Sequence, residues 1–169
     1  MYRPPAGAHK REHEPPPSGE GKATNDHRYA DAMADFDPRS DYPIGARRPD
    51  LVRTPGGLAI ADLTLEQLRA GAIPDDEFRA TPETLRLQAE VARNAGRDQL
   101  ADNFDRAAEL ALIPDHVILE IYTALRPRRS SGEELERWAT RLENDYGAPA
   151  IAAQVREAAT AYAARGLLA

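Results

Sequence analysis

Hydrophobic and polar positions divide the chain into three regions of different character. Residues 1–40 show no sustained apolar periodicity and are rich in Pro, Gly and charged side chains. Residues 41–63 carry separated apolar residues between prolines, and residues 64–169 carry apolar residues at spacings of three and four, punctuated by Pro and Gly. These patterns predict a disordered tail, an extended strap and a helical domain, in that order.

The N-terminal tail contains one short stretch with helical spacing. Proline clusters at positions 4–5 and 15–17 argue against stable structure in the tail as a whole. Tyr29, Met33 and Phe36 nevertheless lie at i, i+4 and i+7, which places them on one face of a helix if one forms. Two interpretations stand: a helix that docks on a partner or targets the chain, and a segment that fluctuates, because so short a helix is marginal in water.

The strap region has the composition of extended chain. Its prolines disfavour helix, and Gly56-Gly57 is typical of a turn. Its apolar anchors are Tyr42, Ile44, Leu51 and Val52. Because an extended segment cannot form a core of its own, we expect the strap to lie against the helices or against another chain.

Helix boundary signals recur through residues 64–169. Starts are predicted by capping residues or by Pro at a first helical position: Thr64, Pro74, Thr81-Pro82, Asp115, Ser130 or Ser131, and Pro149. Ends are predicted by Gly or Pro: Gly71, Gly96, Pro114, Pro127, Gly147 and Gly166. The segments between these signals predict about five main helices in an irregular all-α array.

Apolar stripes indicate which face of each helix is buried. In chain order the stripes are Leu100, Phe104, Ala107, Ala108 and Ala111; Val117, Ile118, Ile121, Tyr122 and Leu125; Leu135, Trp138, Ala139, Leu142 and Tyr146; and Ile151, Val155, Ala159 and Tyr162. Arg106 and Glu109 fall on the opposite face of the first of these helices. The sequence shows neither a convincing strand-like alternation nor a fixed-period repeat, so we predict an all-α fold.

Charge and composition exclude several classes of protein. The formal net charge of −6 at pH 7 argues against a protein that binds nucleic acid by neutralising phosphates. A chain without Cys has no disulfide framework, thiolate nucleophile or Cys-based metal site. Because no apolar run approaches the roughly 20 residues that span a bilayer, we expect a cytoplasmic protein without a membrane segment.

The chain shows no catalytic constellation. His9, His13 and His27 lie in the tail, and His116 beside Asp115 is typical of a helix start. Acidic clusters also fall near predicted helix starts, where negative charge is favourable. Neither a phosphate-binding loop nor a nucleophile elbow is present. The sequence therefore predicts no catalytic, cofactor-binding or metal-binding residue, and it favours an interaction subunit.

Two clusters of Arg are candidate contact sites. One is Arg47-Arg48, and the other comprises Arg126, Arg128 and Arg129 around Pro127. One interpretation of the second cluster is that it offsets the dipole of the helix before it. The other is that its guanidinium groups bind an acidic patch on a partner subunit.

An ordered series of phrases resembles the small-subunit family of propanediol and glycerol dehydratases. The phrases are Asp41-Tyr42-Pro43, Arg48-Pro49-Asp50-Leu51, Thr81-Pro82-Glu83-Thr84-Leu85-Arg86-Leu87-Gln88-Ala89, Asn103-Phe104, Arg106-Ala107-Ala108-Glu109-Leu110, Ile118-Leu119-Glu120-Ile121-Tyr122, Ala124-Leu125-Arg126-Pro127, Arg129-Ser130 and Val155-Arg156-Glu157-Ala158-Ala159. The resemblance covers nearly everything from Asp41 to about Arg165, in order and at compatible spacing. The tail lies outside it.

The resemblance implies a heterotrimeric enzyme, itself dimerised, that converts 1,2-diols such as propane-1,2-diol and glycerol to aldehydes with loss of water. It implies a large subunit with the substrate in a TIM barrel, and adenosylcobalamin held between the large and medium subunits. The small subunit of this family carries no catalytic residue and packs on the large subunit. The long N-terminal extension resembles that of the propanediol enzymes, which implies a bacterial microcompartment and contacts with its shell or cargo.

The candidate subunit-interface residues combine aromatic or apolar anchors with Arg, and they come from the strap and from the end of the second stripe. They are Tyr42, Pro43, Arg47, Arg48, Leu51, Tyr122, Arg126, Pro127 and Arg129. The preference between propane-1,2-diol and glycerol cannot be read from a chain that lacks the substrate pocket. A stand-alone helical adaptor is the alternative function, and an autonomous hydrolase is disfavoured because no nucleophile can be paired with a base.

Overall fold

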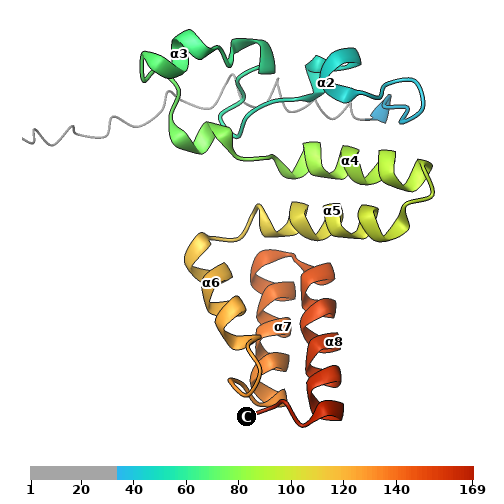
Figure 1. Ribbon diagram of the computed structural model, residues 1–169, viewed down its shortest axis with the longest axis vertical. Coiled ribbons are helices and arrows are strands. Elements are labelled where there is room, and N and C mark those ends of the chain that lie inside the picture. Colours follow the sequence, from blue (N-terminus) through green and yellow to red (C-terminus); the bar gives the residue numbers. More distant parts are fainter. Residues whose placement is uncertain (1–33) are drawn as a thin grey trace, which may run out of the picture. The chain divides into compact units, whose positions relative to one another are not determined.

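Helices make up most of the described part of the chain, which is residues 34–169 of the computed structural model (Figure 1). The predicted tail helix around Tyr29 and Met33 lies outside the described residues. The five main helices are α4 (Pro82–Asn94), α5 (Asp98–Leu110), α6 (Asp115–Ala124), α7 (Gly132–Tyr146) and α8 (Pro149–Arg165). Within residues 34–169 the extended pairing is limited to an isolated bridge between Arg53 and Ala59. The all-α prediction is therefore confirmed.

The strap is interrupted by three short helical turns, α2 (Ile44–Arg47), η1 (Pro49–Leu51) and η2 (Ile60–Asp62). Its prolines permit these turns, because Pro43 and Pro49 stand at helix starts, where a missing backbone donor costs nothing. Ile44 and Leu51 are buried and anchor the strap as apolar side chains. The chain is extended only between the turns, which differs from the uninterrupted strap expected from its prolines.

A turn at Gly56-Gly57 follows, and it is tied to a later segment. The Gly57 backbone has a φ of 89°, which favours glycine. The Gly56 N–H donates to the Glu77 carboxylate over 3.1 Å, and a Cβ at Gly56 would collide with that carboxylate. Glu77 belongs to η3 (Asp75–Phe78), so this bond closes the loop that contains α3 (Leu65–Arg69).

Helices α4 and α5 form an antiparallel pair with a core of small residues (Figure 1). Thr81 caps α4 as predicted, with its hydroxyl accepting from the Thr84 N–H, and Pro82 is the first helical residue. The core between the helices consists of Ala89, Ala92 and Ala101, with Phe104 packed against it. The predicted stripe of α5 is wrong by one position at its start, because Leu100 is 39% exposed and Ala101 is buried.

Helices α6, α7 and α8 share a second core of larger side chains. It contains Ile113, Val117, Ile121, Leu135, Ala139, Leu142, Ala148, Ile151, Ala152 and Val155. The predicted capping box of α7 is confirmed, since Ser131 and Glu134 bond to each other's backbone N–H groups. Gly147 ends α7 with a left-handed φ of 60°, also as predicted.

The last residues close the end of this unit. The Leu167 carbonyl accepts from the Arg128 N–H over 2.7 Å, and the Ala169 N–H donates to the Ser130 carbonyl over 3.0 Å. These bonds hold Arg128 at a φ of 61°, which is uncommon for a residue other than Gly. The segment after α8 is therefore part of the fold that shapes the loop between α6 and α7.

Candidate interaction surfaces

Three observations on residues 34–169 concern metal sites, membrane segments and ligand pockets. No group of three or more His, Asp or Glu side chains with metal-binding geometry occurs among them. No helix in this described portion is long and apolar enough to cross a membrane. An apolar hollow between α5, α6 and α8 has a volume of about 100 Å³. Since ligand sites typically have about 300–1,000 Å³, this hollow suits a protein side chain better than a cofactor.

The strap presents some of its predicted contact residues and buries others. Tyr42 is 53% exposed, and Pro43 and Arg47 are also exposed. Leu51 is fully buried, so its side chain belongs to the fold of this chain. Arg48 is largely covered, and its guanidinium contacts carboxylates of the strap itself.

The ion pairs of Arg48 fold the strap back on itself. Its guanidinium lies 3.0 Å from the Asp41 carboxylate and 3.1 Å from that of Asp50. The Asp37 backbone N–H, with help from Arg48, holds the pKa of Asp41 below its usual value, and Arg48 does the same for Asp50. Arg48 therefore acts within the chain, while its neighbour Arg47 is exposed.

The end of α6 presents the second predicted contact region. Arg126, Pro127 and Arg129 are all exposed, and Arg129 lines an open hollow with Leu119 and Trp138. Tyr122, which was placed in the apolar stripe of α6 and among the candidate interface residues, is 61% exposed. Apolar periodicity identified the correct stripe of α6, but part of that stripe faces away from the core.

A different set of charges joins α7 to α8. The Arg156 guanidinium lies 2.6 Å from Glu143 and 2.9 Å from Glu136, both on α7. Arg156 lowers the pKa of Glu143, and the two carboxylates, Glu143 first, raise the pKa of Arg156. Arg156, Glu136 and Glu143 thus pair with one another, and these ion pairs hold α7 and α8 together.

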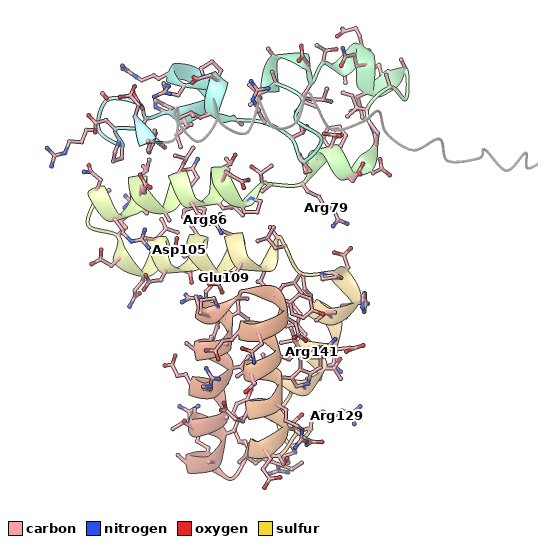
Figure 2. The ribbon with its side chains drawn as sticks, turned by 180° about the vertical axis from the view of Figure 1, so that it is seen from behind. Arg79, Arg86, Asp105, Glu109, Arg129 and Arg141 are labelled. Atoms are coloured by element: carbon pink, nitrogen blue, oxygen red, sulfur yellow. The ribbon has the colours of Figure 1, made fainter. Side chains whose placement is uncertain are left out.

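Sequence analysis missed the role of Glu109, which was assigned to the outer face of α5. Its carboxylate accepts from the backbone N–H groups of Ala150 over 3.0 Å and Ile151 over 2.8 Å (Figure 2). Those donors are in the first turn of α8, which has no side-chain cap of its own. A carboxylate from another helix thus supplies the cap, and only the missing cap at Ala148-Pro149 signalled the need for one.

Exposed large apolar side chains were also missed. Outside the predicted interface set they are Leu58, Ile60, Leu65, Leu68, Phe78, Leu100, Leu112 and Leu119. Leu65 and Leu68 are both on α3, and Leu100 is the member of this set that had been placed in a predicted apolar stripe.

Comparison with known proteins identifies the family of this chain. Residues 38–169 match the family model described as "Dehydratase small subunit". Two proteins named "Propanediol dehydratase small subunit", from Citrobacter freundii and Salmonella typhimurium, are each 52% identical to the chain over 126 residues. These alignments cover 75% of this chain and 73% of each relative. The family match thus spans the strap and the whole helical region.

Proposed function

The chain belongs to the dehydratase small-subunit family, and we propose that it is the non-catalytic small subunit of a coenzyme-B12-dependent diol dehydratase. The enzyme converts 1,2-diols such as propane-1,2-diol and glycerol to aldehydes with loss of water. The observation that carries the proposal is the 52% identity to two propanediol dehydratase small subunits over three quarters of the chain.

The proposed task of this chain is to support assembly by packing on the large subunit. The strap contributes Tyr42, Pro43 and Arg47 at its surface, while Arg48 and Leu51 hold the strap in the shape that presents them. The end of α6 contributes Tyr122, Arg126, Pro127 and Arg129. Tyr and Arg are the residues that most often dominate the binding energy of protein interfaces.

Adenosylcobalamin belongs to the proposed holoenzyme and is held by the large and medium subunits. When bound, it supplies the radical that starts the rearrangement of the diol. The hollow of about 100 Å³ beside α6 is too small for a corrin ring. We therefore assign no cofactor-binding residue to this chain, and its proposed part in the reaction is to hold the assembly together.

The proposed assembly is a dimer of heterotrimers, located in the cytoplasm or inside a bacterial microcompartment. The N-terminal tail of residues 1–40 is the proposed contact with the compartment's shell or cargo, on the basis of its composition and the spacing of Tyr29, Met33 and Phe36. Deleting residues 1–38 should leave the heterotrimer intact and alter solubility or association with the compartment. Failure of the heterotrimer to form after this deletion would assign the tail to assembly instead.

Co-expression tests the proposal. The full chain is produced with the cognate large and medium subunits, with an affinity tag on the large subunit alone. We expect the small chain to co-purify in a fixed ratio to the other two. A small chain that stays out of the complex while the large and medium subunits form an active enzyme would contradict the proposal and support the stand-alone adaptor.

A further inference from the structure

Helix α6 carries large apolar side chains on its outer side as well as on the side that faces the core. Val117 and Ile121 are buried in the core, whereas Leu119 is 67% exposed and Tyr122 is 61% exposed. The other exposed side chains of the helix include Glu120 and Thr123, and large exposed apolar side chains that lie together mark a site of interaction. In contrast, the outer face of α7 is polar, with Glu133, Arg137, Thr140 and Asn144. The uncovered face of α6 therefore has the composition of a buried surface.

The exposed side chains of α6 form a ridge between two hollows. An open hollow of about 440 Å³ lies on the α7 side, where Leu119, Thr123 and Ala124 meet Trp138 and Arg129. A smaller hollow of about 100 Å³ lies on the α8 side, and its lining includes Ile118, Tyr122, Leu125, Ile151 and Val155. We call the ridge and its rim the α6 docking face, made of Ile118, Leu119, Tyr122, Leu125, Arg126 and Arg129. Apolar side chains on the surface of another protein could fit into the two hollows beside the ridge.

The rim of this face carries positive charge that no carboxylate among residues 34–169 pairs with. Arg126, Arg128 and Arg129 are exposed, and none of them makes an ion pair with any residue between positions 34 and 169. Figure 2 shows Arg129 projecting outward near the end of the α6–α8 unit. The acidic side chain nearest in the same hollow is Glu120, whose carboxylate lies 4.0 Å from Arg141.

The helix dipole does not account for three arginines at this point. A single cation near a C-terminus satisfies that interaction, as Arg165 does in the last turn of α8. The other Arg side chains that bridge elements, such as Arg79 to Asp115 and Arg93 to Asp105, have carboxylate partners. In a chain of net charge −6, three clustered and unmatched guanidinium groups indicate carboxylates on another molecule.

We propose that the α6 docking face binds an apolar surface with an acidic rim on the large dehydratase subunit. The inference rests on the proposed function and adds the surface and the chemistry of its partner. Leu119 and Tyr122 enter the apolar centre of the interface, and Arg126 and Arg129 pair with carboxylates around it. A second copy of this chain is a poorer partner. The docking face would have to bind a different surface of that copy, and such a head-to-tail contact adds further copies instead of stopping at a dimer.

Charge reversal tests the rim. The double variant Arg126→Glu/Arg129→Glu is co-expressed with the large and medium subunits, beside a control, Arg137→Glu/Arg165→Glu, with the same change in net charge. Arg137 lies on the polar face of α7, and Arg165 matches Arg126 in its place at a helix end. We expect the docking variant to raise the dissociation constant of the small chain by about tenfold or more, and the control to change it little.

The outcomes separate this inference from the proposed function. Equal retention of the docking variant and the control over a rising salt series would overturn the docking face. Failure of the unmodified chain to join the complex would instead contradict the proposed function. Thermal unfolding of each purified variant checks the fold, and both should unfold near the unmodified chain because all four Arg side chains are exposed.

A crosslink identifies the occupant. Tyr122→p-benzoylphenylalanine places a photoreactive group on the ridge, and the same replacement of the exposed Thr140 on α7 is the control. We expect light to join position 122, but not position 140, to the large subunit within the intact complex. A crosslink from position 122 to the medium subunit or to a second copy of this chain, or none at all, would contradict the proposed occupant.

Discussion

The α4–α5 pair and the α6–α8 unit are both helical, but they are held together in different ways. Alanines fill the core of the first, with Phe104 at its edge. Leu, Ile and Val side chains dominate the core of the second. Small residues let two helices approach closely, so the stability of the α4–α5 pair depends on the close fit of the two helices. The stability of the α6–α8 unit depends instead on the apolar area that its large side chains remove from water.

Glu109 joins these two regions. It is carried by α5 and bonds to two backbone N–H groups in the first turn of α8. The joint therefore combines a helix cap with a favourable interaction between a carboxylate and the positive end of a helix. We therefore expect the α6–α8 unit to be most sensitive to the truncation of a core side chain, and the α4–α5 pair to be sensitive to the enlargement of one. Loss of the Glu109 carboxylate should weaken the contact between α5 and α8.

Leu142→Ala should have the largest effect on folding. Leu142 is fully buried in the α6–α8 core, and deleting three carbons there leaves a cavity. We expect a loss of about 2–5 kcal/mol in the free energy of unfolding, measured by urea titration of the full chain. Leu119→Ala, the same change at an exposed site, should cost less than about 0.5 kcal/mol. Equal losses for the two variants would refute the assignment of the core.

Ala101→Leu should have the next largest effect. Ala101 is fully buried where α5 faces α4, so a larger side chain has no room without moving the helices apart. We expect a loss of about 1–3 kcal/mol in the same titration. The exposed Ala153 on α8 provides the control, since Ala153→Leu should change the free energy of unfolding by less than about 0.5 kcal/mol. A neutral Ala101→Leu would mean that the pair is not closely packed.

Glu109→Gln should have a smaller effect, confined to the joint. The amide keeps one acceptor but loses the charge and the second acceptor, so we expect a cost of about 0.5–2 kcal/mol. Hydrogen exchange should show faster exchange of the first amides of α8 and little change within α4. Glu157→Gln removes an exposed carboxylate from α8 and should leave this exchange unaltered. Unchanged exchange in Glu109→Gln would disprove the capping role.

The smallest effect concerns pH and the Arg156 network. Arg156 lowers the pKa of Glu143 from its usual 4.5, so the folded state favours the ionised carboxylate more than the unfolded state does. The stabilisation is therefore complete above pH 4.5 and is lost as the pH falls through the lowered pKa. Unfolding curves of the unmodified chain and Glu143→Gln should differ at neutral pH and converge in acid. The control Glu90→Gln, at an exposed position on α4, should follow the unmodified chain throughout.

Local signals predicted the starts of α4 and α7 and the end of α7, because the residues that cap these ends are close in sequence. Thr81, Ser131 with Glu134, and Gly147 act as their types and positions indicated. Glu109 could not be predicted in this way, since its partners lie 41 and 42 positions further along the chain. Its role depends on how α5 meets α8, and no spacing rule within one helix contains that information.

The candidate surfaces were predicted less completely, for a related reason. Apolar periodicity marks a side chain for burial but does not say whether its own chain or a partner buries it, so the stripe of α6 did not separate Tyr122 from the core residues Val117 and Ile121. Arg48 was grouped with Arg47, yet its carboxylate partners are Asp41 and Asp50 of the same segment. Only the three-dimensional structure separates the arginines that are matched within the chain from those at the end of α6 that are not.

The central claim is that this chain works by completing a dehydratase rather than by chemistry of its own. The most direct measurement compares adenosylcobalamin-dependent aldehyde formation from propane-1,2-diol by purified large and medium subunits, with and without the full-length small chain. The account predicts that a stable, active complex forms only when the chain is added, and that the chain alone produces no aldehyde. Full assembly and activity of the large and medium subunits without it would contradict the account.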